Sequence, residues 1–217
     1  MEGASARLFV ALDLPAPVRE TLLRWRAPLL TASPDALRPV PAEALHVTLC
    51  FLGSRPLAAV DAIAAAVLAA CRAAAGGSGA AAGGVDATAG GSRAAAGGGD
   101  AGALPGALAL GAPLWLPRRR PHALAVAVDD GDGALGALQR TLALALAGGG
   151  WLRAEQRPFL PHVTVARVRR GGDPRALARR PLDGPPAAPF TGAAVTLYRS
   201  RLGGGGARYE ALARVPS

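Results

Sequence analysis

The stretch FLPHVTVARVRR, residues 159–170, has the apolar residues of a buried strand but carries a histidine and a threonine inside it. A second stretch, ALHVTLCFLG at residues 44–53, repeats His-Val-Thr in another apolar run. Burying an imidazole and a hydroxyl costs free energy unless both groups find partners. Two copies of one costly pattern therefore indicate a shared purpose, and they divide the chain into two related halves.

Alternation along a strand gives each His-Val-Thr one polar face. Side chains two residues apart point to the same side, so His46 and Thr48 project together, as do His162 and Thr164. The apolar residues between and after them project to the opposite face, where a core would take them. Two such polar faces set across a cleft would present two imidazoles and two hydroxyls to one small ligand.

Strand-like and helical patterns surround the two copies. Apolar runs predict strands at residues 7–15, 44–53, 107–117, 121–130, 159–168, 190–200 and 207–215. Helical spacing predicts helices at residues 15–30, 57–75 and 133–147. A duplicated, two-lobed α+β architecture fits this order better than a doubly wound sheet. No glycine-rich nucleotide-binding loop opens any of these helices.

The length of 217 residues suits a single domain of two lobes, spanning residues 1–217. From Ala73 to Pro105 the chain consists mainly of glycine and alanine without periodicity, which predicts a flexible insertion. The net charge is +9, and a field of that sign attracts anions such as nucleic acid. A solvated surface explains the same charge equally well, so charge alone does not identify a ligand.

The cysteine content and the N-terminal sequence indicate the cellular compartment in which the protein is expected. Cys50 and Cys71 are the only cysteines, and the first residues do not resemble a secretion signal, so we expect a reduced, cytoplasmic protein. No charge-free apolar stretch reaches the roughly 20 residues of a membrane span, so no membrane partner is expected.

The two histidines and two threonines suit metal-free cleavage of a phosphodiester. One imidazole can accept a proton from water while the other donates one to the leaving oxygen, and the hydroxyls can hold phosphoryl oxygens. Zinc usually takes three or four protein ligands, and the only further histidine is His122, so neither a metal nor a cofactor is expected. Strict alternation places Cys50 on the His46 face, but nothing marks it as a nucleophile, and we interpret it as lining the cleft or the core.

A structural role is the alternative for each polar residue. A single His-x-Thr in a strand is more often a satisfied polar pair than a catalytic one, and His122 is assigned to that class. Two copies in corresponding strands favour function.

Four segments carry a resemblance to a known family: RLFVALDLP (7–15), LHVTLCFLG (45–53), RPFLPHVTVARV (157–168) and LYRSRLGGGGARYEALARVP (197–216). Together they resemble the 2H phosphoesterases, and within them the bacterial and archaeal RNA 2′,3′-cyclic phosphodiesterases, also called 2′-5′ RNA ligases. The resemblance covers nearly the whole chain except the insertion. It implies two pseudo-symmetric lobes, each an antiparallel sheet with helices outside, flanking a central cleft.

The resemblance also implies roles for individual residues. His46 and His162 correspond to the catalytic histidines. We assign His46 as the proton donor and His162 as the proton acceptor, although the symmetry of the motifs leaves this order open. Thr48 and Thr164 correspond to the phosphate-binding threonines, and Arg167 to an arginine near the phosphate. Strict alternation puts Arg167 on the back face, so its role requires a bulge or a strand end.

The implied reaction is hydrolysis of a terminal RNA 2′,3′-cyclic phosphate to a 2′-phosphate, with reversible 2′-5′ RNA ligase activity as an addition. The expected partners are RNA with such ends, for example tRNA halves, or small cyclic nucleotides, and the expected state is a monomer. Two alternatives stay open: a phosphodiesterase for small cyclic nucleotides or 2′-5′ oligonucleotides, and a non-catalytic RNA-binding protein of the same fold.

Overall fold

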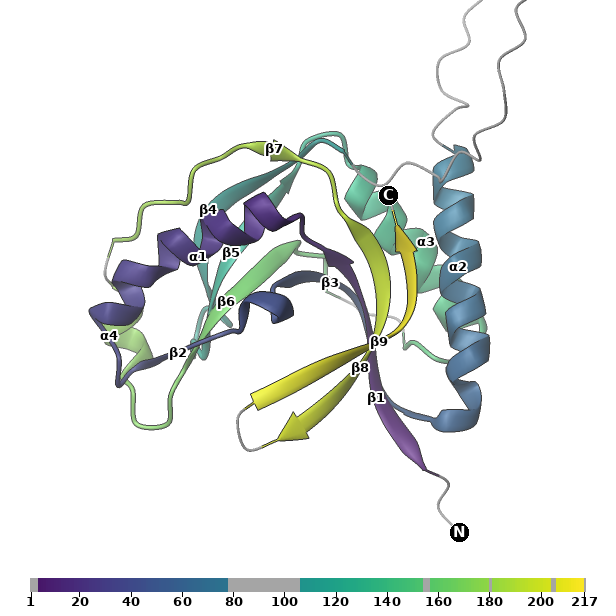
Figure 1. Ribbon diagram of the computed structural model, residues 1–217, viewed down its shortest axis with the longest axis horizontal. Helices are drawn as coiled ribbons and strands as arrows, with labels where there is room; N and C mark the ends of the chain where they lie inside the picture. Colours follow the sequence, from purple (N-terminus) through teal and green to yellow (C-terminus); the bar gives the residue numbers. More distant parts are fainter. Residues whose placement is uncertain (1–3, 78–105, 154–156, 180, 204–205, 217) are drawn as a thin grey trace, which may run out of the picture.

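The computed structural model describes residues 4–77, 106–153, 157–179, 181–203 and 206–216 (Figure 1). The predicted insertion at 73–105 lies outside these residues from position 78 onward. Its first residues, 73–77, instead belong to the end of a helix. The helical signal of the preceding alanine-rich run therefore extends further than the change in composition indicates.

Every predicted helix and strand is present. The strands are β1 (Ser5–Asp13), β2 (Leu37–Pro39), β3 (His46–Pro56), β4 (Leu108–Leu116), β5 (Ala123–Asp130), β6 (His162–Val168), β7 (Pro189–Phe190), β8 (Ala194–Gly203) and β9 (Gly206–Pro216). The helices are α1 (Ala16–Thr31), α2 (Val60–Gly77), α3 (Ala134–Gly148) and α4 (Pro174–Ala178), with 3-10 turns η1 (Ala42–Ala44) and η2 (Leu57–Ala59). The sequence did not predict β2, α4 or η1, which are too short to show a periodic pattern, and it did not separate η2 from α2 or β7 from β8.

The strands form one curled antiparallel sheet, which confirms the predicted α+β class. Its order is β7-β4-β5-β6-β3-β1-β8-β9, and β2 pairs with β6 outside this path. The two lobes correspond to the two halves of this order. They are joined where β3 meets β6, through one pair of Cα partners, Val47 and Val163. Each lobe was expected to form its own sheet, whereas the two sheets are continuous with each other.

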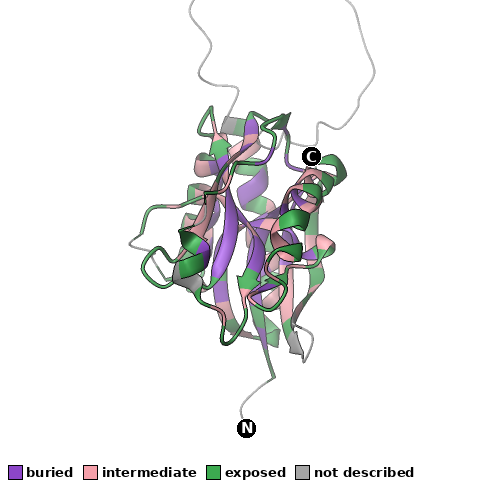
Figure 2. Ribbon diagram, turned by 90° about the vertical axis from the view of Figure 1, so that its left-hand side faces the viewer, coloured by how far each residue is buried: buried purple, intermediate pink, exposed green. Residues whose placement is uncertain are grey.

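Helices α2 and α3 pack against each other and against the apolar face of the sheet. Helix α3 places four leucines at intervals of three or four residues, and all four are buried: Leu135, Leu138, Leu142 and Leu146. The Asp130 carboxylate accepts hydrogen bonds from the first backbone N–H groups of this helix, at 3.0 and 2.8 Å. The buried strands lie at the centre of the molecule in Figure 2.

One helical segment, Leu57–Gly76, is long and apolar enough to cross a membrane, with a mean hydropathy of 1.8. It contains Asp61 and Arg72, and it contributes Ile63 and Val67 to the core beneath the sheet. A core helix of a globular protein passes the same test of length and composition.

Candidate active site

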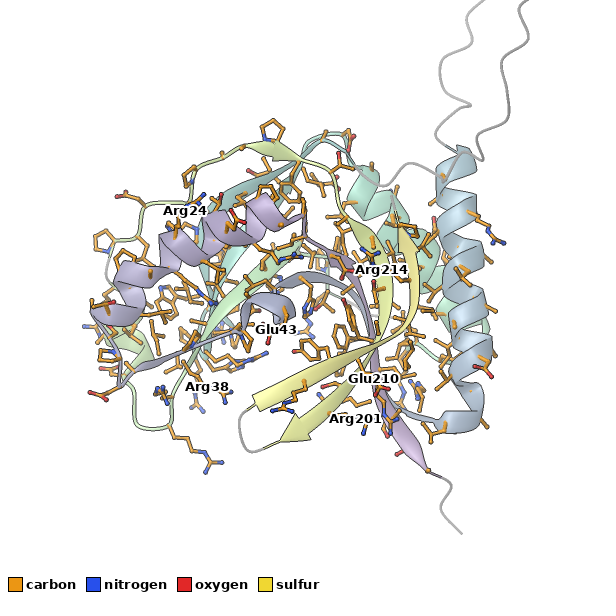
Figure 3. All side chains as sticks on the ribbon, in the orientation of Figure 1. Arg24, Arg38, Glu43, Arg201, Glu210 and Arg214 are labelled. Carbon is orange, nitrogen blue, oxygen red and sulfur yellow. The ribbon has the colours of Figure 1, made fainter. Side chains whose placement is uncertain are left out.

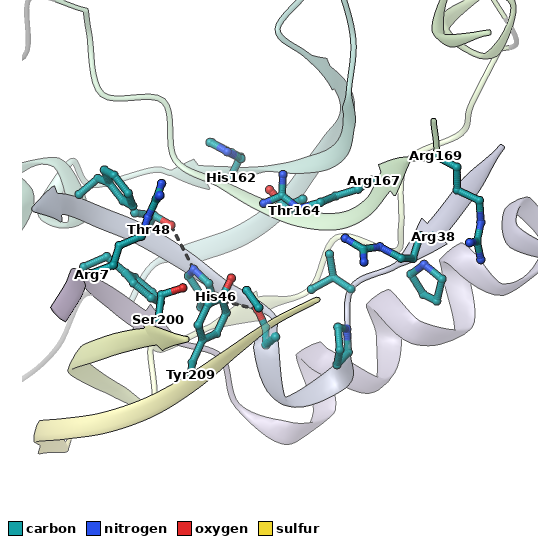
Figure 4. A pocket seen from close by; sticks show the side chains of 17 residues that line it. Arg7, Arg38, His46, Thr48, His162, Thr164, Arg167, Arg169, Ser200 and Tyr209 are labelled. Atoms are coloured by element: carbon teal, nitrogen blue, oxygen red, sulfur yellow. Dashed lines mark hydrogen bonds between the residues drawn. The ribbon is translucent and has the colours of Figure 1, made fainter. Parts of the chain in front are cut away.

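A cavity of about 590 Å³ opens where the two His-Val-Thr strands meet (Figure 4). It receives both histidines and both threonines of the repeated motif, together with Arg167. None of its lining residues belongs to α2 or α3. Its other lining residues are Arg7, Phe9, Arg38, Pro39, Val40, Pro41, Ala44, Phe51, Arg169, Ser200, Ala207 and Tyr209.

Both imidazoles are oriented by the same backbone device. The Nδ1 of His46 lies 2.8 Å from the carbonyl oxygen of Ala44, and the Nδ1 of His162 lies 2.7 Å from that of Leu160. A carbonyl oxygen can only accept, so each Nδ1 carries the hydrogen that it donates. In the neutral form of each ring the Nε2 therefore has the free lone pair. In His46 this atom is 3.1 Å from the Thr48 hydroxyl oxygen.

The pairing of β3 with β6 relates the two motifs by a local two-fold axis. Val47 and Val163, the central residues of the two His-Val-Thr units, are Cα partners in an antiparallel pair. Antiparallel register then sets His46 across from Thr164, and Thr48 across from His162. Each histidine consequently has one threonine beside it on its own strand and another across the sheet.

A bulge in β3 moves Cys50 away from the cavity. The register with β1 pairs Thr48 with Ala11 and Cys50 with Val10, so Leu49 is an extra residue at this point. Leu49 and Cys50 are therefore both buried on the core side. The expectation from strict alternation, Cys50 on the His46 face, was wrong, whereas the core interpretation was right. Burial raises the pKa of the Cys50 thiol to about 12, which does not favour a nucleophile.

A matching bulge in β6 turns Arg167 into the cavity. The register with β5 shifts after Thr164, and both Val165 and Ala166 are fully buried. The next residue, Arg167, accordingly returns to the face of Thr164 and is exposed in the cavity. A role of Arg167 near the phosphate requires a bulge or a strand end, and the bulge is present.

The buried side chain of Arg26, in α1, lies against this second bulge. Its guanidinium donates a 2.7 Å hydrogen bond to the carbonyl oxygen of Val165 and another to that of Val40. Its exposed fraction is 7%, and burial lowers its pKa. Because Val165 is the bulged residue, Arg26 fixes the backbone from which Arg167 projects.

His46 is much more shielded than an ordinary surface histidine. Burial lowers its pKa to about 4, and the charges of His162 and Arg167 act in the same direction. The Ala44 carbonyl and the Asp13 carboxylate oppose this shift without cancelling it. In the ligand-free molecule at neutral pH, His46 is therefore an uncharged imidazole.

Aromatic rings pack around His46. The ring centroids of Phe9 and Tyr209 lie 5.0 and 5.4 Å from that of His46. Asp13, the strand partner of His46, accepts hydrogen bonds of 2.8 Å from the hydroxyls of Thr196 and Tyr198. These contacts join β1, β8 and β9 behind one histidine of the pair.

His122 is exposed and does not line the cavity. Among the described residues, no group of three or more His, Cys, Asp or Glu side chains could hold a metal ion.

Several lining residues escaped sequence reasoning. Arg38 belongs to a strand too short to be predicted. Tyr209 stands in the terminal segment that carries the family resemblance, which was the available signal.

Comparisons with known proteins agree with this geometry. The family model of the 2′-5′ RNA ligase superfamily matches residues 14–204. The RNA 2′,3′-cyclic phosphodiesterase of Escherichia coli strain K12 is 55% identical over 47 residues, which are 22% of this chain and 26% of that protein. The matched segment thus spans about a quarter of that relative's length.

Solved structures show the same fold along nearly the full chain. The E. coli LigT structure in complex with 3′-AMP has a TM-score of 0.62 and 26% identity, covering 97% of both chains. A protein of Thermus thermophilus has a TM-score of 0.61 and 23% identity, also covering 97% of both chains. These matches confirm the predicted α+β fold and the resemblance. The chain belongs to the 2′-5′ RNA ligase superfamily.

Proposed function

We propose that this protein hydrolyses the 2′,3′-cyclic phosphate at the 3′ end of RNA to a 2′-phosphomonoester, with two histidines as acid and base. The observation that carries the proposal is the convergence of two His-Val-Thr units on one cavity, with both Nδ1 atoms bonded to carbonyl oxygens. The activity of the matched E. coli relative and the 3′-AMP bound by LigT support a ribonucleotide phosphate as ligand.

In the proposed reaction, His162 takes a proton from a water molecule whose oxygen attacks phosphorus. The bond from phosphorus to the 3′ oxygen breaks, and His46 donates the proton that this oxygen needs. The attacking and leaving oxygens of such a displacement lie on opposite sides of the phosphorus. The two-fold relation between the motif strands supports this arrangement, because a ligand bound on that axis would have one imidazole on each side.

Thr48 and Thr164 would donate hydrogen bonds to the non-bridging oxygens, and Arg167 would balance their charge. The Thr48 hydroxyl lies beside the Nε2 of His46, so a phosphoryl group that it holds would lie next to this atom. Preorganised donors of this kind stabilise the charge that develops in the transition state. Chemistry without a metal is consistent with the donor set, because the described part of the cavity offers two imidazoles and no carboxylate or thiolate cluster.

The donor role of His46 depends on the bound anion. A proton donor must be protonated before the leaving oxygen departs, yet the pKa of His46 is about 4 in the free molecule. A phosphodiester monoanion beside the ring favours the imidazolium form and raises this pKa. The proposed roles therefore require that substrate binding brings a proton to His46.

The proposal is tested by the pH profile of kcat, which reports the groups of the enzyme–substrate complex, on an RNA that ends in a 2′,3′-cyclic phosphate. We expect a bell shape for the wild type and a loss of different limbs in His46→Ala and His162→Ala. His122→Ala is the matched control, since it removes an exposed imidazole outside the cavity. Full activity of either cavity variant would refute the mechanism.

A further inference from the structure

Arg38 and Arg167 stand directly opposite each other at one end of the cavity. They are Cα partners in the antiparallel pair of β2 and β6, and both side chains are exposed and line the cavity. Directly opposite residues of such a pair share one face of the sheet, and like charges in this position destabilise it. The fold thus maintains an unfavourable arrangement beside the proposed site.

No acidic group neutralises these two guanidinium groups within the part of the chain that the structure describes. The ion pairs found there involve other arginines, and neither Arg38 nor Arg167 has a hydrogen-bond partner among the described residues. A bound anion would remove the repulsion between them. The planar guanidinium matches the oxygens of a phosphate with two parallel N–H donors, so a phosphate group is the anion that fits best.

Arg169 continues this cationic surface away from the histidines. It lies two residues beyond Arg167, just past the end of β6 at Val168. Its Nε donates to the carbonyl oxygens of Pro34 and Leu37, at 3.1 and 3.2 Å, which fixes its position on the cavity wall. In Figure 4, Arg38 and Arg169 lie on the far side of Arg167 from His162. We call Arg38, Arg167 and Arg169 the arginine wall.

We propose that the arginine wall binds a second phosphate, the one that links the terminal nucleotide of the substrate to the nucleotide before it, with Arg167 standing between this phosphate and the one at the histidines. Arg38 is then a specificity-determining residue that favours oligonucleotide ends over cyclic mononucleotides. The proposal rests on the proposed function, because the first phosphate must lie between the histidines. The cavity of about 590 Å³ has room for a nucleotide and a neighbouring phosphate, within the range of ordinary ligand pockets.

The test compares two dinucleotides that both end in a 2′,3′-cyclic phosphate. One has a charged phosphodiester link and the other a neutral methylphosphonate link. For the wild type we expect kcat/KM to be about 10- to 100-fold higher with the charged link, as a charge-assisted hydrogen bond would give. In Arg38→Gln this preference should fall about tenfold or more. Arg38→Lys keeps the positive charge but lacks the two parallel N–H donors of the guanidinium, so this variant should retain part of the preference for the charged link.

Arg24→Gln is the matched control. Arg24 is an exposed arginine of α1 that does not line the cavity, and its removal changes the net charge equally (Figure 3). It should keep the preference for the charged link. A wild type without such a preference, or an Arg38→Gln variant that retains it in full, would overturn the proposal. Equal loss in Arg24→Gln would also overturn it, because the effect would then be one of net charge.

A binding measurement separates this inference from the proposed function. Calorimetry with the corresponding 2′-phosphate dinucleotides, charged and neutral at the link, requires no turnover. If the protein hydrolyses neither substrate but binds the charged dinucleotide in an Arg38-dependent manner, the proposed function fails and the second phosphate site stands. If it hydrolyses both substrates equally well, the proposed function stands and the second phosphate site fails.

Discussion

Lowering the pH from about 7 to about 5 should destabilise the fold through His46. In the unfolded chain this imidazole has its ordinary pKa of 6.5, whereas burial lowers the pKa to about 4 in the folded molecule. Between these values the unfolded chain binds a proton that the folded chain does not. The stability that the neutral ring allows is therefore complete above pH 6.5 and is lost as the pH falls toward 4.

The size of this effect follows from the two pKa values. One unit of pKa difference corresponds to about 1.4 kcal/mol, so the free energy of unfolding should fall by about 2 kcal/mol between pH 7 and pH 5. Urea unfolding followed by circular dichroism at both pH values measures it. Few carboxylates titrate in this window, so the histidine dominates the difference.

A variant isolates the contribution of His46. In His46→Gln the loss of stability between the two pH values should become smaller by about 2 kcal/mol, because Gln does not titrate. His122→Gln removes an exposed imidazole, and its free energy of unfolding should fall between pH 7 and pH 5 by the same amount as that of the wild type. If the free energy of unfolding of His46→Gln falls between the two pH values as much as that of the wild type, the conclusion that the fold holds this ring in its neutral form is refuted.

The remaining predictions concern the geometry around the cavity. Binding of a non-hydrolysable monoanionic analogue near pH 7 should take up about one proton in wild type, measured by calorimetry in buffers of different ionisation enthalpy; no uptake would contradict the donor role of His46. Thr48→Val should lower kcat about 10- to 100-fold with little change in stability. Asp13→Asn removes a charge that raises the pKa of His46, so the alkaline limb of the pH–rate profile should shift to lower pH. Arg26→Met should cost about 1–3 kcal/mol of stability. It should also reduce the effect of a second change, Arg167→Gln, on activity, measured by a double-mutant cycle; strict additivity of the two effects would contradict the link between these arginines.

Much of the fold could be predicted because the relevant signals are local. The leucine spacing of α3 and the two His-Val-Thr strands are complete within their own segments, and both motifs lie where alternation predicts. The pairing of β3 with β6 could not be predicted in register, since about half of the chain separates the partner valines. Sequence alone therefore supplied the two polar faces but not the contact that joins them.

The sequence predictions failed or stayed incomplete where the backbone departs from regular alternation. One extra residue in β3 sends Cys50 into the core, and one extra residue in β6 brings Arg167 to the cavity. Neither bulge contains a glycine at the extra position, so composition gave no sign of it. Arg26 similarly resembles a surface arginine of an amphipathic helix, although its partners are carbonyl oxygens of distant segments.

Incubation with an RNA that ends in a 2′,3′-cyclic phosphate, in the presence of a chelator, tests the central claim most directly. The position of the product phosphate is read by phosphorus NMR or by mass spectrometry after selective degradation. Conversion to a 2′-phosphate end that persists with the chelator and is lost in His46→Ala and His162→Ala is the predicted result. A 3′-phosphate product, hydrolysis that stops with the chelator, or no hydrolysis by the wild type would contradict the proposed two-histidine mechanism.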